Sequence, residues 1–136
     1  MITWRYTKKI IDVNSISEFE TAYGHRFEKE YIDCVMQNNG GRPSASVYDT
    51  SNTKERTIKK LLSYNKADSE SIWQTNEYLA MSNPELVGFA IDDFGNTICF
   101  LKEKTSVVFL SHETGKIEHL SNDFQDFLAM LRQENA

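Results

Sequence analysis

The sequence predicts an α+β domain in which helices at both ends of the chain enclose an antiparallel meander. Apolar residues recur at helical spacing over residues 15–38 and again over residues 124–131. Between residues 86 and 120, four short apolar or β-branched runs alternate with turn-forming residues. Helices followed by a run of strands and a closing helix are typical of the α+β class. Because 136 residues can build one core, we expect residues 1–136 to form a single domain.

The first helix is expected over residues 16–23. Ser15 followed by Glu18 matches a capping box, in which the two side chains satisfy free backbone amides at a helix start. Gly24 is placed to end the helix in the left-handed conformation. Residues 1–14 are left unassigned, because the spacing of their apolar side chains favours neither a helix nor a strand.

A second helix is expected over residues 26–38. The turn Asn38-Asn39-Gly40-Gly41 should end it, because Asn and Gly accept the left-handed conformation of a helix cap, and Pro43 prevents a restart. One face of this helix carries the residues predicted to pack inward: Phe27, Tyr31, Cys34 and Val35.

The middle of the chain alternates short apolar and polar segments. Residues 45–48 are predicted to form a short strand, and the polar residues 49–56 a loop that we expect to be the most mobile segment. Residues 58–64 fit a strand or a helix about equally, and we favour a strand because polar residues cluster just beyond it. A third helix should run from Asp68 or Ser69 to Met81. Its apolar positions are Ile72, Trp73, Tyr78 and Leu79.

The last third of the chain predicts the meander. Strands are expected over residues 86–91, 97–101, 106–110 and 116–120, with turn chemistry between them. A final helix should start at Ser121 or Asn122. Its buried face is expected to contain Phe124, Phe127, Leu128 and Leu131.

Charge and composition argue against several classes of protein. Fifteen Lys and Arg against twenty Asp and Glu give a net charge of −5, which disfavours general nucleic-acid binding and favours cations or basic proteins as partners. No apolar run is long enough to cross a bilayer, and the N-terminus lacks the apolar core of a signal peptide, so we expect a cytoplasmic protein without a membrane partner. Cys34 and Cys99 are expected to be reduced packing residues.

No residue pattern predicts catalysis or a metal site. His25, His112 and His119 lack paired metal-ligand spacing, although the last two flank one predicted hairpin and could approach each other. Asp92-Asp93 could be an acid/base pair or a cation site, but a hairpin turn explains them better. Helix termination likewise explains Asn39-Gly40-Gly41 better than a phosphate cradle. The basic residues Lys54, Arg56, Lys59 and Lys60 could meet an acidic partner, but a solvated loop and strand face is the preferred interpretation.

Four segments in order resemble the SUKH superfamily, in its Smi/Knr cell-wall-regulator branch. They are the early helix with Phe19-Glu20, the segment from Tyr31 to Asn39-Gly40-Gly41-Arg42-Pro43, the run from Phe89 to Phe100 containing Phe89-Ala90-Ile91-Asp92-Asp93-Phe94-Gly95-Asn96, and the closing Phe124-Gln125-Asp126-Phe127-Leu128. The similarity covers nearly the whole chain from about Ser15 onward.

The resemblance implies a non-enzymatic binding protein with helices packed on a twisted, mainly antiparallel sheet and with no cofactor. Bacterial members are commonly immunity proteins that bind and neutralise a cognate toxin domain, often a nuclease; a regulatory interaction module of the cell-wall-regulator type is the alternative. We expect partner binding at Asp49, Asp92, Asp93 and Glu113, in the turns and loops 92–96, 49–56 and 112–115. Residues expected to serve the family motif structurally are Glu20, Asn39, Gly40, Gly41, Pro43, Phe89, Ala90, Asp92, Gly95, Asn96, Phe124, Phe127 and Leu128.

Overall fold

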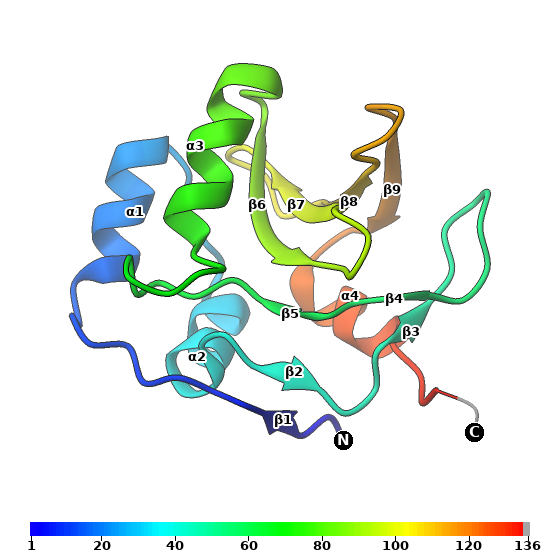
Figure 1. The fold of residues 1–136 in the computed structure, drawn as a ribbon, viewed down its shortest axis with the longest axis horizontal. Coiled ribbons are helices and arrows are strands. Elements are labelled where there is room, and N and C mark those ends of the chain that lie inside the picture. The colour runs from blue at the N-terminus through cyan, green and yellow to red at the C-terminus, as the bar shows by residue number, and fades with distance from the viewer. Residues whose placement is uncertain (135–136) are drawn as a thin grey trace.

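A five-stranded antiparallel sheet forms the centre of the molecule. The computed structural model describes residues 1–134, and Figure 1 shows the sheet curling from its first strand to its last. The strand order follows the chain and confirms the predicted meander. Its members are β5 (Lys60–Leu61), β6 (Leu86–Ile91), β7 (Thr97–Leu101), β8 (Val107–Leu110) and β9 (Ile117–Ser121).

Two short antiparallel ribbons flank this sheet. β1 (Trp4–Arg5) pairs with β2 (Arg42–Pro43), so the N-terminal segment that the sequence left open joins the end of the Asn-Gly-Gly turn. β3 (Val47–Tyr48) pairs with β4 (Arg56–Thr57) as a hairpin. The strand preference for residues 58–64 is confirmed at β5, whereas the loop predicted through Arg56 ends one residue earlier because Arg56 pairs with Tyr48.

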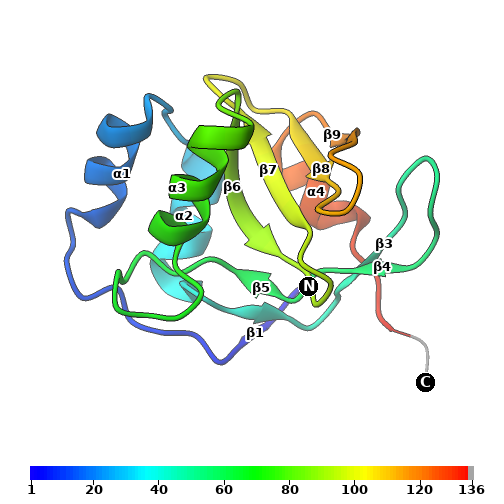
Figure 2. The ribbon, with the colours of Figure 1, turned by 45° about the horizontal axis from the view of Figure 1, so that its top comes forward.

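The described residues form four helices, and three of them cover the sheet on its two faces, which confirms the α+β class. The four helices are α1 (Ser15–Tyr23), α2 (Lys29–Asn38), α3 (Ile72–Ser82) and α4 (Phe124–Met130). Figure 2 shows α3 in front of β6, with α2 and α4 behind the sheet. One face of the sheet is therefore covered by two helices, and the other is covered by α3 only near β6.

The start of α1 differs from the predicted capping box. The helix begins at Ser15 itself, Asn14 occupies the cap position, and no side chain makes a cap hydrogen bond. The amide of Glu18 is instead satisfied by the backbone oxygen of Asn14 at 2.9 Å. The predicted end is confirmed, because Gly24 adopts the left-handed conformation with φ 63° and its N–H bonds the oxygen of Glu20.

The second helix begins later than the predicted residue 26. Phe27 lies before α2, outside any helix or strand, and its amide donates to the carboxylate of Glu20 at 2.7 Å. Glu28 takes the cap position, and its carboxylate accepts from the amide of Phe124 at 2.9 Å. Two carboxylates thus satisfy backbone amides of other segments, and Phe27 stays in the core although it is not helical.

The other two helix starts also move by a few residues. Ser71 caps α3 by accepting from the amide of Gln74, rather than Asp68 or Ser69. Asp123 caps α4 by accepting from the amide of Asp126, rather than Ser121 or Asn122. The residue types are those that cap helices well, because a short oxygen-bearing side chain reaches the free amides.

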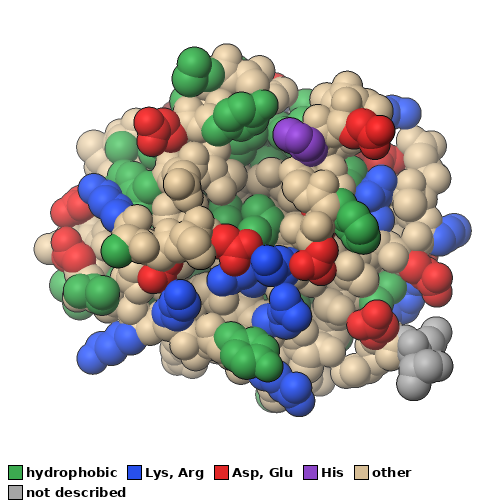
Figure 3. All heavy atoms as spheres, viewed as in Figure 1, with side chains coloured by type: hydrophobic (Ala, Val, Ile, Leu, Met, Phe, Trp, Pro, Cys, Tyr) green, Lys and Arg blue, Asp and Glu red, His purple; other side chains and the backbone are tan. Residues whose placement is uncertain are grey.

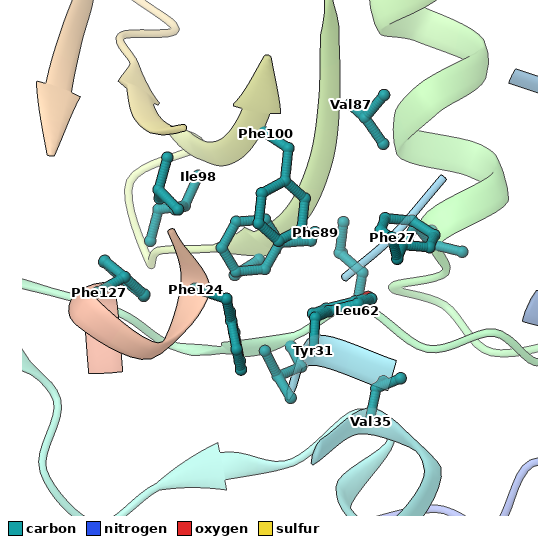
Figure 4. Packing of buried hydrophobic residues seen from close by; sticks show 14 of the residues in the cluster. Phe27, Tyr31, Val35, Leu62, Val87, Phe89, Ile98, Phe100, Phe124 and Phe127 are labelled. Carbon is teal, nitrogen blue, oxygen red and sulfur yellow. The ribbon is translucent and has the colours of Figure 1, made fainter. Parts of the chain in front are cut away.

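Aromatic side chains fill the space between the sheet and helices α2 and α4 (Figure 4). Phe89 and Phe100 on neighbouring strands stack with ring centroids 4.3 Å apart, and Tyr31 meets both edge-on. The hydroxyls of Tyr31 and Tyr64 share a hydrogen bond of 2.8 Å, so neither buried polar group is left without a partner. Burial of these rings supplies the main driving force for folding.

Candidate protein-binding groove

The turn between β6 and β7 is organised by Asp92. Its Oδ1 accepts from the amides of Phe94 and Asn96, and its Oδ2 accepts from the Asn96 side-chain amide, each at 2.8 Å. Asp92 is only 6% exposed, and Gly95 supplies the positive φ of 87° that the turn requires. The carboxylate of Asp92 therefore stabilises the turn, and we do not retain Asp92 as a partner-binding residue.

Asn96 connects this turn to the loop between β8 and β9. Its Oδ1 accepts from the amide of His112 at 2.9 Å, and the His112 ring lies beside Gly95. Two of the three segments predicted to face a partner, residues 92–96 and 112–115, are therefore side by side. Asp93 and Glu113 are the exposed carboxylates of this pair of loops.

The third predicted segment lies elsewhere, against β9. The hydroxyl of Ser51 in this loop donates to the carboxylate of Glu118 at 2.9 Å. Asp49 accepts from the amide of Glu55 at 2.8 Å and pairs with Arg132 at 3.0 Å, and these interactions hold the pKa of its carboxyl below the usual range. The structure thus gives Asp49 internal partners and separates it from Asp93 and Glu113.

A groove of about 690 Å³ opens between α3 and the partly covered face of the sheet. Figure 3 shows this hollow as a cluster of hydrophobic side chains with acidic groups at its edges. Its lining includes Leu79 of α3, Ile91 of β6, Thr97 of β7 and Leu110 of β8, together with the turn at Asp93 and the loop at His112. The structure therefore places the two predicted loops on the rim of an apolar groove.

The helical wall of the groove is fixed to the sheet by Asn76 and Gly88. The buried Asn76 side chain accepts from the amide of Gly88 at 2.8 Å and donates to its oxygen at 2.9 Å. A Cβ atom on Gly88 would lie 3.0 Å from a side-chain methyl of Leu79 and 2.8 Å from that of Thr97, so a larger residue would force these side chains to shift. The groove has rigid walls as a result.

Exposed aromatic side chains lie near the acidic rim of the groove, which Asp93 and Glu113 form. Tyr78 on α3 lines the groove and is 63% exposed, and Phe94 in the neighbouring turn is 77% exposed. From the sequence, Tyr78 was expected only as one of the apolar positions of its helix, and Phe94 was not singled out. An aromatic residue inside the turn Asp93-Phe94-Gly95 was the available signal, because turns lie at the surface.

The remaining chemically reactive residues do not converge. Cys99 is fully buried, Cys34 is half-buried, and burial raises the pKa of both thiols. His25 is buried against Phe100 of β7, whereas His112 and His119 are exposed. Within residues 1–134 no three His, Cys, Asp or Glu side chains are grouped so that they could hold a metal ion.

Asn39 joins three segments from a buried position. Its side chain donates to the oxygen of Lys8 at 3.1 Å and to the hydroxyl of Ser63 at 3.0 Å, and it accepts from the amide of Tyr64 at 2.9 Å. A Cβ atom on Gly41 would lie 2.7 Å from the oxygen of Asn38, which explains a glycine there. The Asn-Gly-Gly turn thus holds the N-terminal segment against Ser63 and Tyr64, just after β5.

The other motif residues lie in or next to the core. Glu20 bonds the amide of Phe27, and Leu128 is partly buried. Gly40 has a φ of 70°, which the turn requires. Pro43 is buried in β2. The fully buried residues of the motif are Phe89, Ala90, Phe124 and Phe127.

Residues 14–128 match the family model described as SMI1-KNR4 cell-wall. The chain belongs to the SMI1-KNR4 family of the SUKH superfamily. The match begins one residue before α1 and ends within α4, so it covers the whole five-stranded sheet and the groove of this SUKH domain. No curated protein matches the chain. Among the described residues, no helix combines the length and apolar character needed to cross a membrane.

Proposed function

We propose that this SUKH domain is an immunity protein that binds a basic toxin domain, a nuclease in the first instance, and neutralises it by occupying its surface. The observation that carries the proposal is the groove between α3 and the sheet, which exposed Tyr78 and Asp93 line. The loops at its rim also expose Phe94 and Glu113. Such a function needs tight binding and no turnover.

The groove has the chemistry of an interface centre. Tyrosine and other large aromatic side chains give much of the binding energy at interfaces, because they bury a large area at a low cost in side-chain entropy. Carboxylates at the edge of such a centre steer a basic partner and fix its orientation. The net charge of −5 adds a long-range attraction for a positively charged nuclease.

The rigid walls favour tight binding as well. Because Asn76 fixes α3 to β6, little conformational entropy is lost when a partner enters the groove. A partner that inserts an apolar side chain into the groove beside Tyr78, with Lys or Arg near Asp93, would use both the apolar floor and the acidic rim.

The first experiment is co-expression with the adjacent reading frame of the source genome. The neighbour is induced in a sensitive bacterium with and without this protein, and survivors are counted. We expect the neighbour to kill alone, the pair to survive, and the two proteins to co-purify. A toxic neighbour that kills equally in the presence of this folded protein would refute cognate immunity. A harmless neighbour bound by this protein would favour the regulatory module instead.

The second experiment measures affinity for the co-purified partner. Asp93→Lys and Glu113→Lys should together weaken binding at least tenfold, mainly through a slower association at low salt. Glu18→Lys with Glu30→Lys reverses two exposed charges, on α1 and α2 outside the groove, and is the matched control. Equal affinities for the wild type, the double variant and the control would remove the acidic rim from the interface.

The aromatic residues are tested in the same assay. Phe94→Ala and Tyr78→Ala should each weaken binding about tenfold or more, because truncating a central aromatic residue typically costs over 1 kcal/mol. Ile11→Ala shortens an exposed apolar side chain elsewhere and should leave the affinity unchanged. If Ile11→Ala is as damaging as Phe94→Ala, the groove is not the centre of the interface.

A further inference from the structure

A second hollow lies beside the apolar groove, and its lining is basic. This cavity of about 440 Å³ is lined by Arg5, Tyr6, Arg42 and Lys59, among others. A smaller hollow next to it shares Tyr6, Arg42 and Lys59. Figure 3 shows several basic side chains gathered below the hydrophobic hollow on the same face of the molecule.

Two arginines stand directly opposite each other in the β1–β2 ribbon. Arg5 pairs with Arg42, and both side chains are exposed. Like charges at directly opposite positions of an antiparallel pair destabilise it. Across residues 1–134 no carboxylate lies within salt-bridge distance of either guanidinium.

The nearby lysines differ from these arginines. Lys59 and Lys60 pair with Glu70 at 2.9 and 3.3 Å, and Lys8 pairs with Asp68 at 3.5 Å. These three lysines therefore have carboxylate partners, Lys59 and Lys60 sharing one, whereas the arginine pair has none among the described residues. An uncompensated pair of forked donors is suited to an external anion, because each guanidinium can bind a carboxylate through two parallel hydrogen bonds.

Tyr6 adds a second and independent feature. It follows Arg5 directly, has a φ of +57°, and is 75% exposed. A left-handed conformation is strained for an aromatic residue and persists only where the surroundings impose it. Here the flanking backbone is held on both sides, by bonds between Thr3 and Ser44 and by the amide of Lys8 on the oxygen of Asn39.

We propose that Arg5, Arg42 and Tyr6 form a binding site for a carboxylate-bearing segment of a protein. The arginines take the carboxylates of one or two Asp or Glu residues, and the Tyr6 ring covers an adjacent apolar side chain. A nucleic-acid strand fits less well, because Asp93 and Glu134 line the same hollow and the net charge of −5 repels a continuous polyanion. An acidic peptide presents separate charges that can avoid both carboxylates.

This site stands independently of the proposed immunity function. It adjoins the apolar groove, since Lys59 and Asp93 line both hollows, but it uses different side chains. Its ligand has the opposite charge to the basic partner expected at Asp93 and Glu113. A protein that bound both sites would need a basic region and an acidic region next to each other.

The test is an NMR titration of the full chain at low salt with a blocked peptide in which two Asp or Glu residues are separated by one apolar residue. We expect saturable shifts centred on the Arg5 and Arg42 side-chain signals and the Tyr6 amide, with a Kd on the order of 1 mM. The double variant Arg5→Gln with Arg42→Gln should weaken binding at least fivefold. The single variant Arg42→Lys keeps the charge but should still bind more weakly than the wild type, because lysine lacks the bidentate fork.

A control variant separates this site from general charge effects. Arg26→Gln removes an exposed arginine that lies outside the hollow, so it should bind the peptide as the wild type does. Parallel titrations use inorganic phosphate and a short deoxythymidine oligonucleotide, and both should bind more weakly than the peptide. Shifts spread over all basic side chains, equal losses in Arg26→Gln, or tighter binding of the oligonucleotide would each overturn the proposal.

Discussion

The buried His25 is expected to make the stability of the domain strongly dependent on pH. Its ring is 3% exposed and stacks on Phe100 at 5.7 Å, and its Nδ1 accepts from the amide of Glu103 at 2.8 Å. Burial, with a smaller contribution from the charge of Lys102, lowers the pKa of His25 to about 4. In the unfolded chain the pKa of a histidine is about 6.5.

The sign and the size of the effect follow from these two values. Below about pH 6.5 the unfolded chain binds a proton at this ring while the folded protein does not, so unfolding is increasingly favoured as the pH falls. The loss stops growing below about pH 4, where the folded protein also becomes protonated. Between about pH 7 and pH 4.5 the contribution to the free energy of unfolding should fall by roughly 2.5 kcal/mol.

Urea unfolding at several pH values measures this loss. His25→Asn keeps an oxygen that can accept from the amide of Glu103 and removes the titrating ring, so its stability should change about 2.5 kcal/mol less than the wild type over the same range. His119→Asn removes an exposed histidine and should follow the wild type. Parallel curves for wild type and His25→Asn would show that His25 titrates alike in both states, and the argument from burial would be wrong.

Three further substitutions test the interactions that shape the turns and the groove. Asn39→Ala should lower the free energy of unfolding by about 3 kcal/mol, since two buried hydrogen bonds and one partly buried one are lost. Substitution of the exposed Asn122 by Ala should change it by less than about 0.5 kcal/mol in the same denaturant assay. Gly88→Ala should cost about 2 kcal/mol by pushing α3 from the sheet, seen as a lower Tm, and an unchanged Tm would contradict the close approach. Asp92→Asn places a side-chain amide group opposite that of Asn96, so it should lower the free energy of unfolding by about 2 kcal/mol. It should also shift the NMR signal of the His112 amide, and an unchanged signal would disprove the link through Asn96.

Local patterns in the sequence were sufficient for the meander and for most of the core. Residues 86–110 are rich in β-branched and aromatic residues separated by turn residues, and the strands form there. Two helix starts, those of α2 and α4, were less accessible because an amide at or just before each of them bonds to a side chain outside the helix. The amide of Phe27 is satisfied by Glu20, and that of Phe124 by Glu28, which is 96 residues earlier in the chain. No local motif contains that information.

The candidate site was predicted only in part. Asp93 and Glu113 could be placed in turns from the sequence, and the structure brings their loops together through Asn96. The exposed position of Tyr78 depends on which side of α3 meets the sheet, and periodicity leaves that open when apolar residues occur on several sides of a helix. The Arg5–Arg42 pair depends on the pairing of two strands of two residues each, and nothing in the sequence connects them.

The attachment of α3 to β6 separates the residues that hold the fold from those that face outward. Asn76 and Gly88 are buried and cannot change freely, whereas Tyr78 and Phe94 are mostly exposed and contribute little to the core. Substitutions at the exposed positions should alter stability by no more than about 0.5 kcal/mol. Relatives of this chain can therefore acquire new rim residues one at a time, each leaving a folded protein, and a lineage could shift from one partner to another without passing through an unstable intermediate.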